Sequence, residues 1–523
     1  MPKNSTLRFL VRASLGLVAT AAIAAPFATQ AQSAERKRVI VVFEQAANAN
    51  DRAMLAGLDG RVKLEIAELN AFAVDLPVKA VAKLQANKRV KYVEDDTLQY
   101  ALGAKSGDRL AGPAGITAQE TPYGITMVQA DLLPGTHAQN RRVCIIDSGY
   151  ELAHEDLTGN NATGENLTRS GDWDTDELHH GTHVGGTVSA INNNLGVVGV
   201  LPNGDVSLYI VKVFDESGSA PSSLIAEAMV HCGQHHSNVI SMSLGGSAPS
   251  QLQQTAARLL DQKGVLMIAA AGNGGNSAIS YPAGYAEVVS VGALDSNMNW
   301  ATFSQFNDDV ELSAPGVTVL STVPMGTGTD SSVVAGGQSF EVIGMEDSPF
   351  ASATAPLADF GLGDTIDPAM NGNICLIQRG DITFAEKVQN CEASGGLGAV
   401  IYNNVPGPLL GTLAGAVTHI PSVGADGNDG PALLAKVGQT TTVTVEVSNY
   451  ALFDGTSMAT PHVSAVAALV WSYYPDCTAT QIRKSLARSS MDLGDPGRDT
   501  KFGFGLVQAK DAFVRINALG CGN

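Results

Sequence analysis

The chain has 523 residues, more than one ordinary domain, and a formal net charge of −19 at pH 7. The acidic excess lies after residue 102, which argues against nucleic acid or an anionic membrane as a partner. Only 6% of the residues are aromatic while 56 are glycine, a bias that suits small-residue helices packed closely on a sheet.

Residues 1–31 predict a secretory signal peptide. Basic residues at Lys3, Arg8 and Arg12 precede an apolar stretch over 13–25, and small residues follow it up to residue 31. That stretch is too short for a membrane span, and no later run reaches the roughly 18 apolar residues that a span needs. We therefore expect a secreted, extracellular protein that does not bind membranes.

Residues 36–102 predict a compact α+β module. Strand patterns occupy 39–43, 72–76 and 90–96, and a helical pattern occupies 80–84. On this pattern alone the module could be any small domain, including a binding module. A Gly/Ala-rich linker follows over 103–118.

Two segments in the middle of the chain place chemically active side chains at the ends of secondary structure. An apolar run over 143–146 ends at Asp147, which predicts a buried parallel strand with a carboxylate at the edge where α/β active sites collect. The run 179–188 predicts a helix of small residues with His180 near its start. Taken alone, Asp147 could instead be a turn or helix-capping residue.

A third segment, 455–462, places Ser457 between small residues at the start of an Ala/Val-rich helix. A helix N-terminus favours a developing negative charge, as a nucleophile requires, although a simple helix cap has a similar pattern. Upstream, a buried strand over 265–271 runs into a glycine-rich turn that contains Asn273. In an unknown chain such an asparagine is ordinarily a turn residue.

The order Asp147, His180, Ser457 within these motifs resembles the subtilisin family of serine endopeptidases. The resemblance covers residues 119 to about 518, apart from one insertion. It implies an α/β fold, a three-layer sandwich with a mostly parallel sheet. It also implies that Asp147 orients His180, that His180 is the general base, that Ser457 is the nucleophile, and that Asn273 donates to the oxyanion with the backbone N–H of Ser457.

The same resemblance predicts how substrate binds. The segment 241–246 would pair with an extended peptide as an added strand, and 269–274 would form the opposite wall of the S1 pocket. No carboxylate occurs at these positions, so we expect a broad, apolar-leaning S1 preference. The predicted substrate-binding residues are Ser243, Leu244, Gly245, Gly246, Gly272 and Gly274.

Two rival functions remain to be weighed. His179 and His183 have the spacing of zinc ligands, but the residue after His179 is another histidine rather than the glutamate of a zinc protease. We expect His179 to be solvated and His183 to be packed structurally. A non-catalytic extracellular binding protein with the same fold is the other rival, and the presence of every catalytic residue argues against it.

The resemblance assigns roles to the remaining segments. Residues 36–102 resemble an inhibitory propeptide, with autocleavage expected near Leu102. The catalytic domain is expected over 119–324 and 450–523, and the insertion over 325–449 resembles a protease-associated domain that either binds substrates or partners, restricts access to the cleft, or merely stabilises the fold. We expect a monomer whose partners are protein or peptide substrates and its own propeptide.

A structural calcium ion is also implied by the resemblance. The loop 191–197 is rich in backbone carbonyls and amide side chains, and hard calcium prefers six to eight oxygen ligands. The predicted ligands are the side chains of Gln119, Asp156 and Asn193 and the carbonyls of Ile191, Leu195 and Val197.

Six cysteines in an exported chain predict three disulfides, for which 15 pairings are possible. Cys375 and Cys391 both fall in the insertion, and Cys477 and Cys521 both fall in the C-terminal segment. We expect these to pair, which leaves Cys144 with Cys232.

Overall fold

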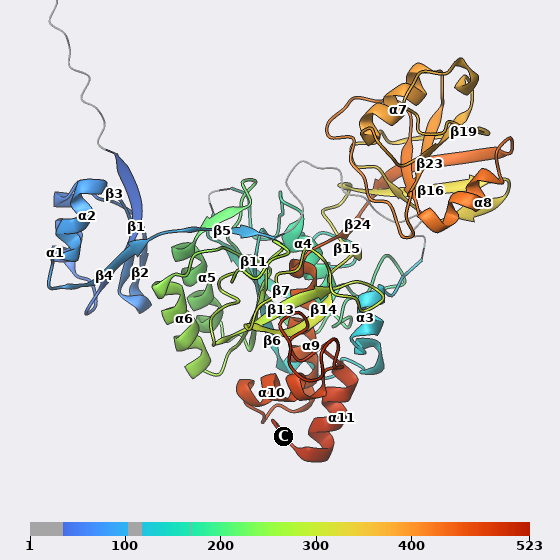
Figure 1. The fold of residues 1–523 in the computed structure, drawn as a ribbon. Helices are drawn as coiled ribbons and strands as arrows, with labels where there is room; N and C mark the ends of the chain where they lie inside the picture. Colours follow the sequence, from blue (N-terminus) through green and yellow to red (C-terminus); the bar gives the residue numbers. More distant parts are fainter. Residues whose placement is uncertain (1–34, 103–117, 169) are drawn as a thin grey trace, which may run out of the picture.

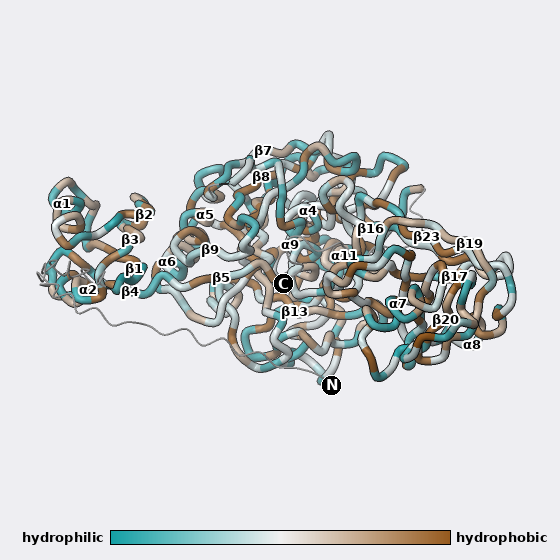
Figure 2. The backbone as a smooth tube through the Cα atoms, turned by 90° about the horizontal axis from the view of Figure 1, so that it is seen from above, coloured by the Kyte–Doolittle hydropathy of each residue, from teal (hydrophilic) through white to brown (hydrophobic). Residues whose placement is uncertain are grey.

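The computed structural model describes residues 35–102, 118–168 and 170–523; the predicted signal peptide and most of the predicted linker lie outside these ranges. Three bodies lie in a row, with the N-terminal module and the inserted domain on opposite sides of a central domain (Figure 1). The view from above shows the same order (Figure 2). In the part of the chain that is described, no helix is both long and apolar enough to cross a membrane.

The central domain is built on a seven-stranded sheet in which every neighbouring pair is parallel. Its strands are wholly or largely buried except at the β7 edge, as expected for a parallel sheet covered on both faces. In spatial order the strands are β14 (Val310–Pro315), β13 (Val288–Leu294), β12 (Leu266–Ala270), β10 (Val239–Met242), β6 (Arg142–Asp147), β8 (Ser207–Lys212) and β7 (Asn161–Asn166).

Helices cover both faces of this sheet. One face packs against α4 (His180–Ser189), α9 (Thr456–Tyr473), α10 (Ala479–Ser489) and α11 (Ala509–Leu519). The other face packs against α5 (Ser222–Gln234) and α6 (Gln251–Gln262). The predicted three-layer sandwich is therefore confirmed.

The N-terminal module is a four-stranded antiparallel sheet in the order β2 (Arg61–Ile66), β3 (Ala71–Pro77), β1 (Arg36–Phe43), β4 (Val90–Asp95). Side chains alternate between its two faces, because successive residues of a strand point in opposite directions. Val39, Val41 and Phe43 pack with the module's own helices, α1 (Ala49–Gly57) and α2 (Val78–Gln85). Ile40 and Val42 instead belong to the same apolar cluster as residues of α5 and α6.

The inserted domain leaves the central domain through a two-stranded antiparallel stem of β15 (Val319–Thr322) and β24 (Tyr450–Phe453). Beyond the stem lies a mixed eight-stranded sheet with α7 (Phe384–Ala393) and α8 (Gly430–Leu434) beside it (Figure 1). In spatial order its strands are β17 (Gln338–Phe340), β16 (Gly328–Ala335), β23 (Thr440–Ser448), β19 (Ala351–Asp359), β20 (Ile374–Gln378), β21 (Gly398–Tyr402), β22 (Ser422–Ala425) and β18 (Val342–Gly344).

All three expected disulfides are confirmed. Cys144–Cys232 ties β6 to α5, and Cys375–Cys391 ties β20 to α7 within the inserted domain. Cys477–Cys521 ties the C-terminal tail to the segment before α10. No free cysteine occurs among the described residues.

Candidate active site

The carboxylate and the imidazole of the predicted triad are in direct contact. Asp147 is the last residue of β6 and His180 is the first residue of α4, and both side chains are fully buried. His180 Nδ1 lies 2.7 Å from Asp147 Oδ1. Burial lowers the pKa of His180, but the Asp147 and Asp176 carboxylates and the Leu102 carbonyl together raise it by more, so the net pKa is raised.

Ser457 lies one residue inside α9, which begins earlier than its apolar run suggests and contains Pro461. Proline has no N–H to give to the carbonyl four residues before it, and that carbonyl belongs to Ser457. Ser243 Oγ donates to the Ser457 carbonyl instead, at 2.7 Å. In return Ser457 Oγ donates to the Ser243 carbonyl at 3.0 Å, while His180 Nε2 has no hydrogen-bond partner among the described residues.

Asn273 is held in a single orientation by the residue before the serine. Its Oδ1 accepts from the backbone N–H of Thr456 at 2.9 Å and from the Thr456 hydroxyl at 2.8 Å. Both donors fix the amide so that Nδ2 points the other way, where it donates to the carbonyl of Leu102 at 3.2 Å. This role of Thr456 was not predicted from the sequence, although the residue is adjacent to the predicted nucleophile.

Gly455 lies where these groups converge. A Cβ at this position would be 2.9 Å from Leu102 O, 3.1 Å from Asn273 Nδ2 and 3.5 Å from Ser457 N, and the backbone φ is +156°. Only glycine leaves room for a carbonyl to approach both donors, at the N-terminus of α9. The arrangement forms a cradle for one carbonyl oxygen, and the Leu102 carbonyl lies in it.

The segment that delivers Leu102 is β5 (Leu98–Ala101), which runs from the N-terminal module into the central domain (Figure 1). It pairs antiparallel with β11 (Leu244–Gly245) on one side and with β9 (Ser219–Pro221) on the other. The sequence analysis expected the first of these strands but not β9, which is three residues long and has no apolar alternation. An extended peptide therefore lies between two strands and ends at the triad.

The other predicted cleft residues fall in two groups. Leu244 and Gly245 pair with β5, Leu102 N donates to Ser243 O, and Gly246 exchanges backbone hydrogen bonds with Tyr281. Gly272 N donates to the Thr456 hydroxyl rather than to the peptide, and Gly274 lies exposed in the turn after β12.

His183 and His179 behave differently from each other. His183 is buried, stacks on Phe453 with ring centroids 4.2 Å apart, and has Nε2 3.0 Å from the Val319 carbonyl. Burial lowers its pKa to about 3, so it stays neutral as a packed residue. His179 precedes α4 and is partly buried rather than fully solvated.

Two of the predicted calcium ligands, Asp156 and Asn193, contact each other, and Asp156 is buried. Asp156 Oδ1 accepts from Asn193 Nδ2 at 2.9 Å, and Oδ2 accepts from Val197 N at 2.8 Å. Gln119 Nε2 donates to the Ile191 carbonyl at 2.9 Å, which joins two more of the predicted ligands. Burial raises the pKa of Asp156, which identifies a desolvated carboxylate that a cation would stabilise. The oxygen-rich donor set fits calcium better than a softer metal.

Comparison with known proteins agrees with this geometry. The subtilase family profile matches residues 138–353 and 414–505. The chain belongs to the subtilase family. A PA domain profile matches residues 341–433, and a fervidolysin N-terminal prodomain profile matches residues 23–95. The chain is thus a subtilisin-like serine endopeptidase with a prodomain and an inserted PA domain.

Individual relatives show the same relationship. Subtilisin amylosacchariticus of Bacillus subtilis subsp. amylosacchariticus is 34% identical over 309 residues, which cover 57% of this chain and 76% of the relative. The alkaline protease of Alkalihalobacillus alcalophilus is 34% identical over 336 residues, which cover 60% and 81%.

Solved structures also resemble this chain. The psychrophilic subtilisin-like protease Apa1 of Pseudoalteromonas sp. AS-11 aligns with a TM-score of 0.66 and 41% identity, covering 77% of this chain and all of that one. Fervidolysin of Fervidobacterium pennivorans aligns with a TM-score of 0.59 and 22% identity, covering 92% of this chain and 61% of that one, and so supports the fold alone.

Proposed function

We propose that this chain is a secreted endopeptidase, made as a zymogen that cuts itself after Leu102 and then hydrolyses protein substrates through an acyl-enzyme. The observation that carries the proposal is the position of Leu102. Its carbonyl lies 3.2 Å from Asn273 Nδ2, at the end of a strand paired with β11. A scissile carbonyl needs that placement.

The proposed chemistry assigns one task to each group. The Ser457 hydroxyl turns from the Ser243 carbonyl toward His180 Nε2, gives up its proton there and attacks the carbonyl carbon. Asp147 stabilises the imidazolium that forms, and His180 then protonates the leaving amine. Asn273 Nδ2 and Ser457 N donate to the oxyanion, and water later hydrolyses the acyl-enzyme.

We propose an S1 site that prefers apolar residues, because the residues beside the Leu102 side chain are small and uncharged. A Cβ at Gly245 would lie 3.3 Å from Leu102 Cδ1 and 2.2 Å from Ser280 Oγ, so a larger residue there would fill the pocket. The predicted cleft residues Ser243, Leu244, Gly246, Gly272 and Gly274 carry no charge either. Proteins with apolar residues before the cut are the proposed substrates.

Inhibition by the prodomain is proposed to rest on two carboxylates as well as on β5. Glu94 accepts from Gln251 N and Leu252 N, at 2.8 and 2.9 Å, in the first turn of α6. Asp96 accepts from Ser223 N at 2.9 Å at the start of α5 and pairs with Arg38 at 2.6 Å. Helix N-termini favour negative charge, so both contacts hold the prodomain on the catalytic domain.

Calcium is proposed as a structural ion held by Gln119, Asp156, Asn193 and the carbonyls of Ile191, Leu195 and Val197. The ion would neutralise the buried Asp156 carboxylate and stiffen the loop. We also propose secretion through residues 1–31, a monomeric enzyme, and boundaries at 36–102, 119–324, 325–449 and 450–523. The inserted domain is proposed to bind substrates or to limit access to the cleft.

The maturation step provides the test of this function. Wild-type protein is expected to yield a mature form whose N-terminus, read by sequencing, begins at Gly103, whereas Ser457→Ala accumulates as an uncut precursor. Active protein that still begins near Arg38, or a Ser457→Ala variant that matures unaided when purified alone, would refute self-cleavage after Leu102.

A further inference from the structure

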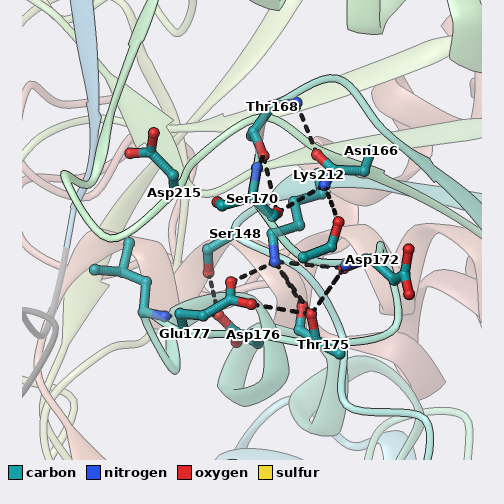
Figure 3. A network of polar contacts seen from close by, with 12 residues as sticks. Ser148, Asn166, Thr168, Ser170, Asp172, Thr175, Asp176, Glu177, Lys212 and Asp215 are labelled. Atoms are coloured by element: carbon teal, nitrogen blue, oxygen red, sulfur yellow. Dashed lines mark hydrogen bonds and ion pairs between the residues drawn. The ribbon is translucent and has the colours of Figure 1, made fainter.

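The loop over residues 171–177, just before His180, is fixed to the sheet by a buried lysine (Figure 3). Lys212 ends β8 in register with Asp147 on β6, and its side chain is fully buried. Its Nζ donates to the carbonyls of Thr175 at 3.0 Å and Asp172 at 3.3 Å, and pairs with the Glu177 carboxylate. A buried ammonium needs such partners, so the loop has little freedom to move.

Asp176 lies inside this fixed loop, and its carboxylate is almost fully buried, at 6% exposure. Its Oδ2 accepts from both the backbone N–H and the hydroxyl of Thr182, each at 2.7 Å. Its Oδ1 accepts from the backbone N–H of His179 at 3.0 Å. These N–H groups belong to the first turn of α4 and its cap, which an α-helix leaves unsatisfied. The carboxylate therefore holds the turn that carries His180.

Asp176 also reaches Asp147 through a single hydroxyl. Ser148 Oγ lies 2.8 Å from Asp176 Oδ1 and 3.2 Å from Asp147 Oδ1, and it accepts from Gly181 N at 2.8 Å. Ser148 N donates to Asp147 Oδ1 at 2.7 Å. The same small cluster thus contacts the backbone on both sides of the Asp147–His180 pair.

The backbone after Ser148 is shaped to bring this loop close. Gly149 has φ of +132°, and a Cβ there would lie 1.9 Å from the Thr175 carbonyl. Only glycine allows the end of β6 and the loop to pack at this distance.

We propose that Asp176 is a positioning residue of the catalytic machinery, a second buried carboxylate that acts through Ser148 and the first turn of α4 to hold His180 against Asp147. The proposal rests on the peptidase activity of the chain. It gives Asp176 a role that no motif in the sequence analysis assigned to it.

The charges around His180 give this role a distinctive signature. Asp147 faces it from β6 and Asp176 from the preceding loop, the neutral His183 lies on α4 itself, and the Leu102 carbonyl approaches from the prodomain strand. Burial lowers the pKa of His180, and both carboxylates raise it. Removing the Asp176 charge therefore lowers that pKa, and because the neutral imidazole is the active base, the acid limb of kcat/KM moves to lower pH.

The test compares Asp176→Asn with Asp172→Asn in the mature enzyme on a small peptide substrate. Asp172 is an exposed carboxylate of the same loop that points away from the cluster in Figure 3. Asp176→Asn is expected to lower kcat per active site roughly 10- to 100-fold with little change in KM, since small misplacement of a base is costly. Its acid limb should also move to lower pH, whereas Asp172→Asn should match wild type in both.

Ser148→Ala provides a second variant in case Asp176→Asn fails to mature. It keeps both carboxylates, so kcat should fall while the acid limb stays near that of wild type. Active sites are counted with an organophosphorus inhibitor, so that misfolded protein does not count as slow enzyme. The proposal would be overturned if both variants kept the kcat and the acid limb of kcat/KM of the wild-type enzyme. It would also be overturned if Asp176→Asn lowered the melting temperature but left the acid limb of kcat/KM unshifted. Inactive wild-type protein would instead refute the peptidase function.

Discussion

At the scale of single residues, the site depends on side chains that orient or hydrogen-bond the groups proposed to take part in the chemistry. Asn273 can donate to an oxyanion only if its amide is turned the right way, and the backbone N–H and hydroxyl of Thr456 determine that orientation. The buried carbonyl of Ser457 stays satisfied because Ser243 replaces the donor that Pro461 lacks. The chemistry of the site therefore depends on residues that do not react.

Thr456→Val tests this orientation. The change removes the hydroxyl but keeps the backbone donor, so we expect kcat to fall about tenfold, less than the roughly 10²–10³-fold expected for Asn273→Ala as loss of an oxyanion donor. Steady-state kinetics on a peptide substrate gives both values. Adding Thr456→Val to Asn273→Ala should cost little more, because the two residues act as a unit.

Thr460→Val is the matched control, since Thr460 is also buried in α9 and its hydroxyl donates to the Thr456 carbonyl within the helix. It should keep wild-type kcat. An equal fall in kcat for the two threonine variants would show that the packing of α9, and not the orientation of the Asn273 amide, explains the effect.

The proposed catalytic residues could be picked out from the sequence because each lies in a short local motif at the end of a strand or helix. Asp176, Thr456 and Lys212 were not assigned because nothing in their immediate sequence shows what they will contact. Asp176 is four residues before His180, which is a signal only once α4 is known to start at His180.

At the scale of secondary-structure elements, the prodomain and the catalytic domain meet at helix N-termini. Glu94 should contribute strongly because three groups donate to it: Ser250 Oγ, Gln251 N and Leu252 N. We expect Glu94→Gln to weaken inhibition by an added prodomain about tenfold, which corresponds to about 1.4 kcal/mol. The inhibition constant of separately made prodomain on mature enzyme measures this.

Glu65→Gln is the control for that experiment, because Glu65 pairs with Arg52 of the same module. It should inhibit like wild type. An unchanged inhibition constant for Glu94→Gln would show that β5 alone accounts for binding.

The proposed calcium site makes a second prediction at this scale. Protonation of Asp156 competes with metal binding, and burial raises the pKa of this carboxyl, so calcium should raise the melting temperature less as the pH is lowered from 8 towards 5. Asp156→Asn should abolish this difference. Thermal unfolding with calcium and with a chelator, at both pH values, is the measurement, and identical curves in the wild-type protein would argue against the site.

The strands β5, β9 and β11 illustrate what sequence patterns miss at this scale. They are two to four residues long and pair segments that are more than 100 residues apart in the chain. No periodicity develops over such lengths, so the sequence predicted β11 through its family resemblance and did not predict β9. The buried strands β6 and β12 were predictable because they are apolar runs, whereas the polar edge strand β7 has no such pattern.

At the scale of the whole molecule, the inserted domain and the prodomain flank the catalytic domain on opposite sides (Figure 2). The two ends of the insertion lie side by side, since Thr322 pairs directly with Tyr450. The side of the catalytic domain on which an insertion lies is set by the direction in which its stem leaves that domain. Amino-acid composition does not predict this direction.

Replacing residues 323–449 with an Asn-Gly turn, which suits a two-residue hairpin, isolates the role of the insertion. We expect kcat/KM for a short peptide to stay within about threefold of wild type, because the triad and the β11 strand are retained, while the rate on large proteins changes at least tenfold. Equal effects on short and large substrates would identify the insertion as a stabilising element only.

The proposed function depends most directly on Ser457 as an activated nucleophile, and covalent labelling tests this role. Mature protein treated with diisopropyl fluorophosphate should take up one label per molecule, which peptide mass spectrometry should locate on Ser457, with loss of peptide hydrolysis in proportion. His180→Ala should label far more slowly. Label on another residue, or full hydrolysis by Ser457→Ala, would contradict the proposed active site.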